Sequence, residues 1–253
     1  FWSVLGLFTR ISKRCGHRVH SACCADTRDL RMKSSHPNPP EVLDRPLEQD
    51  PSEWSYQDNY NLLTGLVIPR PIAWMSSIST EGVPNIAPHS YFNAVAVDPP
   101  HVMISSTGIK DSVRNIRATK EFVLNIVTMD DLEDMVFTST DFPPEEDEFE
   151  WSGLTPVASA KVAPPRIAEA KAHLECVFVD EMALGDGTLV FGQVVFVHVD
   201  PSVWRNGRVD PGLLDPVCRL AGSGYASLGK HFRLVIPEWE DVATTEKRPV
   251  RRR

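Results

Sequence analysis

Small hydroxyl and amide side chains gather where three predicted strands end, within residues 61–112. They are Ser76, Ser77, Ser79, Thr80, Ser90, Asn93, Ser105, Ser106 and Thr107. The tripeptide Lys110-Asp111-Ser112 follows them and opens a predicted helix. Hydroxyl groups, a lysine and the free N–H groups of a helix N-terminus suit a phosphate. The stretch is therefore typical of a lining for an anionic, aromatic ligand, although residue types alone favour the simpler interpretation of solvated strand ends.

Two glycine-containing stretches near the C-terminal end resemble nucleotide-binding motifs but depart from them. Residues 222–227 lack the last glycine of a dinucleotide fingerprint and any βαβ unit around it. Residues 224–231 follow the phosphate-loop pattern until His231 replaces the hydroxyl residue that binds magnesium. We expect neither stretch to bind a nucleotide.

The histidines and cysteines do not define a metal site or a nucleophilic triad. There is no HExxH pattern, and His89, His101 and His198 lie on or beside predicted strands, where a histidine is usually structural. The ligand-rich string at residues 15–24 fits no standard zinc-finger spacing. Only Cys176 and Cys218 lie beyond the first 25 residues, so no disulfide framework is expected.

The elements that must position these residues are mostly strands. Apolar runs at residues 72–78 and 91–97 flank the loop EGVPN, and a third run, 101–106, follows Pro99-Pro100, which predicts a three-stranded meander. A helix is predicted over 112–120 with Asp111 as its N-cap, then a strand over 121–127 and a short amphipathic helix over 129–138. The acidic, proline-rich residues 142–150 read as a solvated loop.

The second half of the chain returns to β structure. Strands are predicted over 173–179 and 188–199, joined by the turn Gly185-Asp186-Gly187, and a closing strand over 231–236. About six strands with two or three short helices favour a mainly β protein, namely a closed or split antiparallel β-barrel.

Charge divides the chain into three parts. The first 25 residues hold four basic residues and the tail from Lys247 holds five, with no acid in either segment. The intervening residues therefore carry 17 basic against 34 acidic side chains, which argues against binding to nucleic acid. We expect a leader over 1–45, one domain over 46–240 and a basic disordered tail over 241–253.

The leader is basic, contains serine and lacks acids before Asp26. That composition predicts a transit peptide for the mitochondrion or another organelle, with a disordered leader on a cytoplasmic protein as the alternative. No apolar run approaches the ~18 residues of a membrane-spanning helix, so no membrane association is expected.

Six stretches of the sequence, in the same order, resemble the flavin reductase-like family of FMN-binding split barrels. They are PRPIAWMSSIST, EGVPNIAPHSYFNAVAVDPP, KDSVRNI, DEFEWSGLTP, APPRIAEAKAHLEC and RLAGSGYASLGKHFRL. The resemblance covers roughly residues 54–237. It implies a split antiparallel β-barrel of Greek-key type with a few short peripheral helices. The chain departs from the family pattern in reading RLAGSGY where RLGG is common.

The resemblance also implies which residues bind the cofactor, and none of them is expected to act as a catalytic acid or base. Along the flavin ring and ribityl chain it implies Ser76 and Ser77, and against the ring edge Ser90, Tyr91, Phe92 and Asn93. At the phosphate it implies Ser105, Lys110 and Ser112, with additional contacts from Arg70 and Arg219, the latter across a subunit boundary.

The function implied is that of a homodimeric, FMN-dependent oxidoreductase. Hydride from NAD(P)H would pass to non-covalently bound FMN, and the reduced flavin would serve oxygen, another protein or a second substrate. Two alternatives stay open: an electron-transfer flavoprotein reduced by a protein donor, and a non-catalytic flavin-binding module.

Overall fold

The computed structural model describes residues 43–245. Nearly all of the predicted leader and most of the predicted basic tail thus lie outside the described residues. The 3-10 helix η1 (Pro51–Glu53) and helix α1 (Tyr56–Leu66) precede the sheet. Ser55 begins α1 as its N-cap, because its hydroxyl accepts the Asp58 N–H at 3.2 Å.

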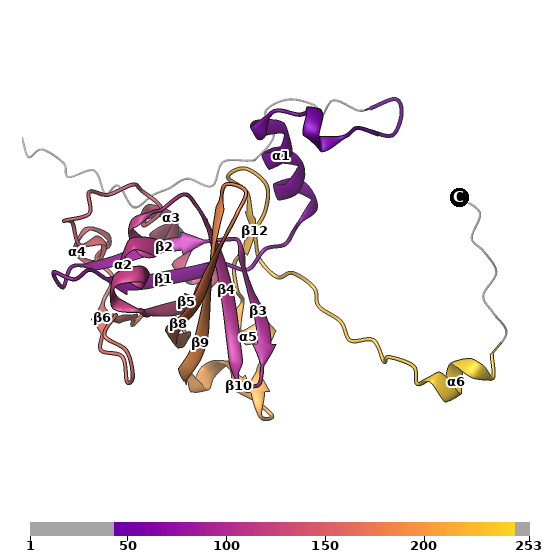
Figure 1. Ribbon diagram of the computed structural model, residues 1–253. Coiled ribbons are helices and arrows are strands. Elements are labelled where there is room, and N and C mark those ends of the chain that lie inside the picture. The colour runs from indigo at the N-terminus through magenta and orange to yellow at the C-terminus, as the bar shows by residue number, and fades with distance from the viewer. Residues whose placement is uncertain (1–42, 246–253) are drawn as a thin grey trace, which may run out of the picture. The chain divides into compact units, whose positions relative to one another are not determined.

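Seven antiparallel strands form the main sheet (Figure 1). They are β1 (Ala73–Ile78), β2 (Pro84–His89), β3 (Phe92–Val97), β4 (Pro100–Thr107), β5 (Glu121–Ile126), β8 (Ala172–Leu184) and β9 (Gly187–Val199). Their order across the sheet is β2-β1-β5-β8-β9-β4-β3. The mainly β, split-barrel fold predicted from the sequence is confirmed.

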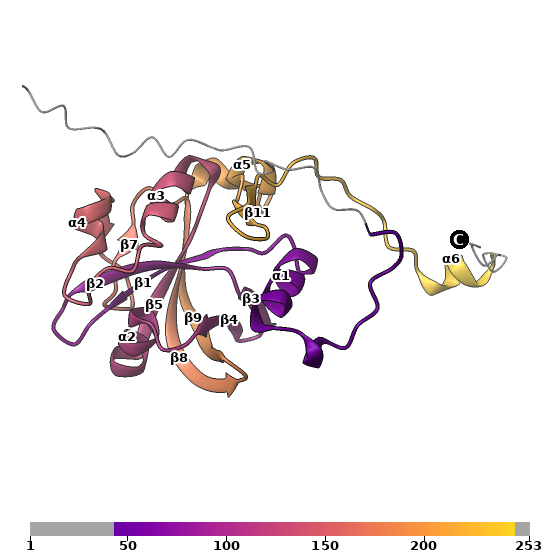
Figure 2. The same ribbon diagram turned by 90° about the horizontal axis from the view of Figure 1, so that it is seen from above.

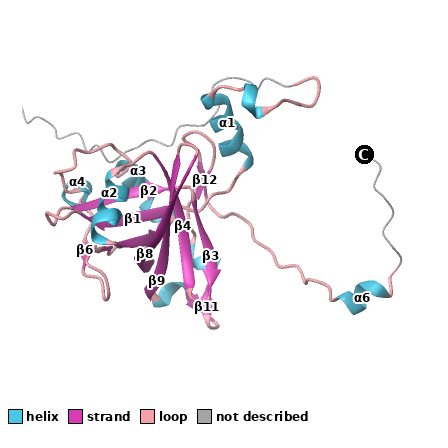
Figure 3. Cartoon of the chain, viewed as in Figure 1, coloured by secondary structure: helices cyan, strands magenta, loops and turns pink. Residues whose placement is uncertain are grey.

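The helices are short, and three two-stranded pairs complete the described structure (Figure 3). The helices are α2 (Asp111–Thr119), η2 (Met129–Asp131), α3 (Leu132–Phe137), α4 (Glu148–Ser152), η3 (Pro201–Val203), α5 (Pro211–Leu214) and α6 (Trp239–Ala243). The small pairs are β6 (Pro156–Val157) with β7 (Arg166–Ile167), β10 (Trp204–Arg205) with β11 (Arg208–Val209), and β12 (Cys218–Arg219) with β13 (Tyr225–Ala226).

Strand β1 runs between two apolar clusters because its side chains alternate between the two faces of the sheet. Trp74 belongs to one cluster, with Ile86 and Phe149, whereas Met75 belongs to the other, with Phe122 among its members. Trp74 and Met75 are both fully buried. Side chains therefore fill the space on both faces of β1, and a bound ligand must lie elsewhere.

The two edges of the sheet, β2 and β3, are consecutive in the chain. Only Ser90 and Tyr91 separate them, so the chain crosses from one edge of the sheet to the other in two residues. The Tyr91 carbonyl accepts the Ser105 N–H of β4 at 2.7 Å, and β2 also approaches β4. The barrel is thus split between β2 and β3, and Figure 2 shows β1 and β2 leading away from β3 and β4.

The predicted three-stranded meander is wrong in its pairing. The strand at 72–78 pairs with β2, which the sequence analysis missed, while the strand at 91–97 pairs with β4. Strand β2 carries Pro84 and Pro88, which disguise it in the sequence. An edge strand tolerates prolines because one side of its backbone needs no ladder partner.

Three further expectations need correction. Asp111 is the first residue of α2 and not its N-cap; the cap is Lys110, and the Asp111 carboxylate instead pairs with Arg114. Residues 231–236 form no strand and are exposed. The acidic stretch is not wholly solvated, since Glu148 is buried at the start of α4. The remaining predicted helices and strands are confirmed, as is the 185–187 turn between β8 and β9, although β8 runs five residues beyond its predicted end at 179.

Candidate functional site

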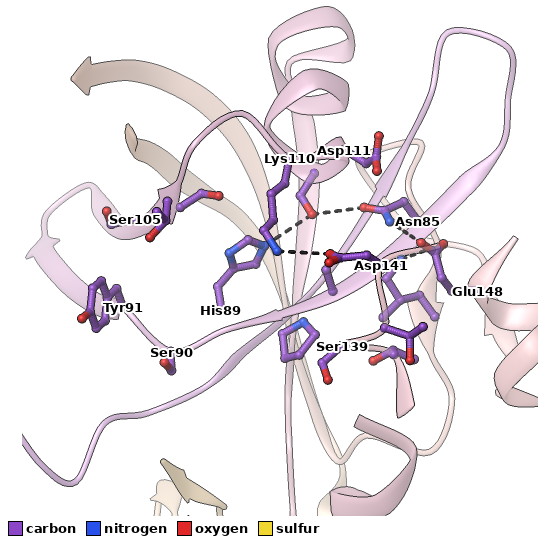
Figure 4. A pocket seen from close by; sticks show the side chains of 18 of the residues that line it. Asn85, His89, Ser90, Tyr91, Ser105, Lys110, Asp111, Ser139, Asp141 and Glu148 are labelled. Atoms are coloured by element: carbon purple, nitrogen blue, oxygen red, sulfur yellow. Dashed lines mark hydrogen bonds and ion pairs between the residues drawn. The ribbon is translucent and has the colours of Figure 1, made fainter. Parts of the chain in front are cut away.

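A pocket of about 370 Å³ opens where β2 and β4 meet at the split in the barrel. Segments distant in sequence line it: the end of β2 and the crossover after it, the end of β4, the start of α2 and the loop after α3 (Figure 4). The lining residues include Tyr60, Arg70, Asn85, Ile86, His89, Ser90, Tyr91, Ser105, Ser106, Lys110, Asp111, Ser112, Asp141, Phe142 and Glu148.

The structure brings six of the eleven sequence-predicted site residues to this pocket. They are Arg70, Ser90, Tyr91, Ser105, Lys110 and Ser112. The other five do not line it: Ser76, Ser77, Phe92, Asn93 and Arg219.

The predicted serines of β1 are fully buried and bonded within the protein. The Ser76 hydroxyl donates to the Pro165 carbonyl, and the Ser77 hydroxyl accepts from Asn115 Nδ2 at 3.1 Å. On β3, Phe92 packs against the core and Asn93 is exposed.

Arg219 pairs with Arg70 through the backbone and does not line the pocket. The two residues exchange backbone hydrogen bonds of 3.0 and 2.9 Å as an antiparallel bridge. The Arg219 guanidinium lies over the Tyr225 ring and donates to its hydroxyl and to the Gly222 carbonyl. Within one chain, Arg219 thus supports the backbone at Arg70.

The Arg70 side chain is a buried cation, 6% exposed, and its hydrogen-bond partners among the described residues are all neutral. Its terminal nitrogens donate to the carbonyls of Thr64, Val67 and Leu220. No carboxylate of the described residues pairs with it, and its Nε has no hydrogen-bond partner there. A buried charge of this kind favours an anionic ligand, because burial without a counter-ion is costly.

Ser106 gives a second unsatisfied group in the pocket wall. Its side chain is buried, and its hydroxyl has no partner among the described residues. Buried polar atoms are nearly always hydrogen-bonded, so one left unpaired beside a cavity is a candidate for ligand contact.

The pocket wall also holds a chain of hydrogen bonds between four buried residues. His89 Nε2 lies 3.3 Å from Ser112 Oγ, and Ser112 Oγ lies 3.1 Å from Asn85 Oδ1. Asn85 Nδ2 donates to Glu148 Oε1 at 2.5 Å. Burial, aided by the Lys110 charge, lowers the pKa of His89 to about 4, whereas burial raises the pKa of Glu148. This series of hydrogen bonds therefore connects the neutral imidazole of His89 to the buried carboxyl group of Glu148.

Charged side chains surround the start of α2. Lys110 Nζ lies 3.3 Å from Asp141 Oδ1, and both side chains are exposed. Asp111 pairs with Arg114 one turn along the helix. The Lys110 ammonium thus lies beside one carboxylate, that of Asp141 (Figure 4).

Sequence reasoning missed Asn85, His89 and Glu148 as pocket residues. His89 looked like any strand histidine, and Asn85 like a turn residue. Glu148 stands 63 positions from Asn85 in an acidic stretch that looked solvated. No local pattern links these residues, because their contact exists only once α4 packs on β2.

Across residues 43–245, no helix is long and apolar enough to cross a membrane. The same residues contain no group of three or more His, Cys, Asp or Glu side chains arranged to hold a metal ion.

Comparison with known proteins identifies the family. Residues 65–213 match the model described as the flavin reductase like domain. An uncharacterised protein of Aquifex aeolicus is 42% identical over 183 residues, covering 70% of this chain and 93% of that protein.

Two solved structures share the fold at substantial identity. Nitrilotriacetate monooxygenase component B from Bacillus cereus has a TM-score of 0.73 at 39% identity, covering 76% of this chain and 100% of that chain. The 2-nitrobenzoate 2-nitroreductase NbaA of Pseudomonas fluorescens has a TM-score of 0.70 at 31% identity, covering 76% and 98%. The chain therefore belongs to the flavin reductase like domain family, a family of flavin oxidoreductases, as its sequence motifs predicted.

Proposed function

We propose that this protein binds FMN non-covalently in the pocket at the barrel split and reduces it with NAD(P)H. One observation carries the proposal. The pocket gathers six residues that the family resemblance assigns to the flavin, together with two buried polar groups, on Arg70 and Ser106, that lack a partner among the described residues.

The residues present suit a flavin nucleotide in size and chemistry. A cavity of about 370 Å³ lies within the range for small-molecule sites, and clustered hydroxyls and backbone groups meet the polar edges of a flavin ring. Arg70 and Lys110 supply positive charge for a phosphate. Tyr60, Tyr91 and Phe142 supply aromatic surface for stacking on a flavin or nicotinamide ring.

The bound flavin supplies the redox chemistry, by accepting a hydride from the nicotinamide. The protein's own residues would bind the flavin, orient it and shield it from water. The rigid strand ends of β2 and β4 fix the hydrogen-bonding groups, and the buried Arg70 charge favours an anionic ligand. No side chain is required to transfer a proton.

The fate of the reduced flavin is part of the proposal. The Bacillus cereus relative is named as a component of a monooxygenase, which supports transfer of reduced flavin to a partner enzyme. The Pseudomonas fluorescens relative is named as a nitroreductase, which favours a small nitroaromatic acceptor as the second candidate. We further propose a homodimer as the active unit and organelle import directed by residues 1–45.

The decisive experiment combines a visible spectrum with steady-state oxidation of NADH and NADPH, with and without added FMN. We expect a yellow protein, or one that becomes yellow with FMN, whose NAD(P)H oxidation depends on FMN. Flavin binding without NAD(P)H oxidation would replace the proposal with a protein-reduced carrier or a binding module. Absence of flavin binding would refute it.

A pair of variants links the activity to the pocket. Arg70→Gln removes the buried charge and should weaken FMN binding, whereas Arg70→Lys should retain part of it. The matched control is Arg208→Gln, at an exposed arginine of β11. Equal FMN binding by Arg70→Gln and Arg208→Gln would place the phosphate elsewhere.

A further inference from the structure

Three hydrogen bonds connect His89 to Glu148 through Ser112 and Asn85 (Figure 4). The groups around Glu148 determine which atom donates and which accepts in each of them. The Ile86 N–H donates to Glu148 Oε2 at 3.3 Å, and Asn85 Nδ2 donates to Glu148 Oε1 at 2.5 Å. Burial raises the pKa of Glu148, while these two bonds oppose that shift. Both carboxyl oxygens thus accept from an N–H donor, an arrangement that favours the carboxylate over the protonated carboxyl group.

Glu148 therefore fixes the orientation of the Asn85 amide. A carboxylate only accepts, so the Asn85 NH₂ group must face it, and Asn85 Oδ1 must face Ser77 and Ser112. The opposite orientation would bring two acceptors within 2.5 Å of each other. Asn85 Oδ1 then accepts from Ser112 at 3.1 Å and from Ser77 at 3.3 Å.

Asn85 in turn determines what Ser112 can do. A serine hydroxyl has one hydrogen, and Ser112 gives it to Asn85 Oδ1. Toward His89 Nε2, 3.3 Å away, Ser112 can then only accept. His89 must carry its hydrogen on Nε2, which leaves a lone pair on Nδ1.

His89 keeps this single form at neutral pH. Its side chain is buried and lines the pocket, and its pKa is lowered to about 4 by burial and by Lys110. Its Nδ1 has no hydrogen-bond partner among residues 43–245. His89 Nδ1 is thus a neutral hydrogen-bond acceptor in the pocket wall.

We propose that His89 is a specificity-determining residue whose Nδ1 accepts a hydrogen bond from an N–H or O–H group of the bound ligand. Glu148, Asn85 and Ser112 are positioning residues that set its tautomer. The inference rests on the proposed function for the identity of the ligand. In a flavin, the donor is a ribityl hydroxyl or a ring N–H.

The proposal changes the expected role of Ser112. Ser112 donates its single hydroxyl hydrogen to Asn85 Oδ1, so it cannot donate to a phosphate while that hydrogen bond is present. A neutral acceptor at His89 likewise suits a donor group better than an anionic oxygen. Ser112 should therefore affect ligands with and without a phosphate alike.

The tautomer can be measured directly by NMR on protein labelled with ¹⁵N-histidine, with the His89 signals assigned by their loss in His89→Gln. At pH 7 we expect a neutral ring with hydrogen on Nε2, before any flavin is added. A ring protonated at pH 7, or one with hydrogen on Nδ1, would overturn the proposal. This test does not depend on flavin binding.

Glu148→Gln gives a sharper test because it should exchange donor and acceptor in each hydrogen bond between residue 148 and His89. The new amide must accept the Ile86 N–H with its oxygen, so its NH₂ faces Asn85 and requires Asn85 to turn round. Asn85 would then donate to Ser112, Ser112 would donate to His89 Nε2, and the hydrogen would move to Nδ1. Glu150→Gln, at an exposed position of the same helix, should leave the tautomer unchanged. An unchanged tautomer in a folded Glu148→Gln protein would refute the role of Glu148.

Binding of riboflavin and of lumiflavin, which lacks the ribityl chain, tests the ligand contact. His89→Phe should weaken riboflavin binding about five- to tenfold, while the exposed control His231→Phe should not. Loss for riboflavin alone assigns the donor to the ribityl chain, and equal loss for both flavins assigns it to the ring. No loss for either would overturn the contact. If the wild-type protein bound neither flavin, the proposed function would fail together with the ligand contact, whereas the NMR result would stand separately.

Discussion

His89 shows how a single buried residue links the pocket to the pH dependence of stability. Its pKa in the folded protein is about 4, below the ordinary value of 6.5. The unfolded chain thus binds a proton between these two values that the folded protein excludes. The stability that the neutral ring contributes is complete above pH 6.5 and is lost as the pH falls toward 4.

The first prediction follows from this sign. Between pH 6.5 and 4, wild-type protein should lose about 3 kcal/mol of unfolding free energy through His89 alone. His89→Gln should remove that part of the slope, and the exposed His231→Gln should not. Urea denaturation at several pH values measures it. Parallel slopes for wild type and His89→Gln would contradict the prediction.

The second prediction separates Lys110 from Ser112, which the sequence placed together at the phosphate. Lys110→Ala should weaken FMN binding about tenfold and leave riboflavin unchanged, because only the phosphate contact is lost. Ser112→Ala should weaken both flavins equally, because it disturbs His89. Fluorescence titration with the two flavins is the measurement. A phosphate-selective loss in Ser112→Ala would restore the original role.

At the scale of elements, the split between β2 and β3 creates the site. Within residues 43–245, β2 pairs with β1 only and β3 pairs with β4 only, so neither continues the ladder into the other. The crossover between these two edges and the end of β4 place Ser90, Ser105 and Ser106 in the pocket lining. The sheet therefore provides rigidity while its opening provides the binding groups.

The third prediction concerns packing between β9 and β5. A Cβ at Gly192 would lie 2.3 Å from Phe122 Cζ, in the fully buried core. Gly192→Ala should therefore destabilise the protein by about 1–3 kcal/mol through overpacking. Gly65→Ala is the matched control, because nothing lies within 4 Å of that Cβ and α1 should gain helix propensity. Equal midpoints of urea denaturation for these two variants would contradict the argument.

For the whole molecule, the filled core determines where a flavin can lie and therefore which surface a second copy would cover. Large side chains such as Trp74, Met75 and Phe122 occupy the space on both faces of β1 and are at most 1% exposed. A flavin in the pocket must therefore lie at the surface, where Tyr60 and Tyr91 are partly exposed. A second copy covering this surface would exclude water from the ring.

The fourth prediction is that the active unit is a two-fold dimer with FMN near the interface. Cyclic two-fold dimers are the commonest closed assembly. Sedimentation across a dilution series, followed together with flavin fluorescence, should show dissociation and flavin release at the same concentration. A monomer that retains tightly bound, quenched flavin would rule this arrangement out.

The fifth prediction concerns residues 1–45, almost all of which lie outside the described residues. Their basic, acid-poor composition before Asp26 predicts import into an organelle. Deleting them should leave flavin content and thermal stability unchanged while abolishing organelle localisation of a tagged protein. Loss of flavin on deletion would instead make this segment part of the domain.

Most of the strands, one hairpin turn and the family could be predicted from the amino-acid sequence. Apolar and β-branched runs predicted β5, β8 and β9, Gly185-Asp186-Gly187 predicted the turn between β8 and β9, and six motifs in order resembled a split-barrel family. These features depend on side-chain periodicity and turn chemistry within a few residues. Such local properties can be read without knowing which strands become neighbours.

The sheet order and the composition of the pocket wall emerge only when the chain folds. Pro84 and Pro88 concealed β2 because proline is excluded from a strand interior but tolerated at an edge, and the sequence does not say which strand is the edge. Asn85 and Glu148 meet across 63 residues, and burial, not residue type, makes Glu148 an orienting group. Charge, tautomer and hydrogen-bond direction depend on which groups share a buried space, and folding alone brings those groups together.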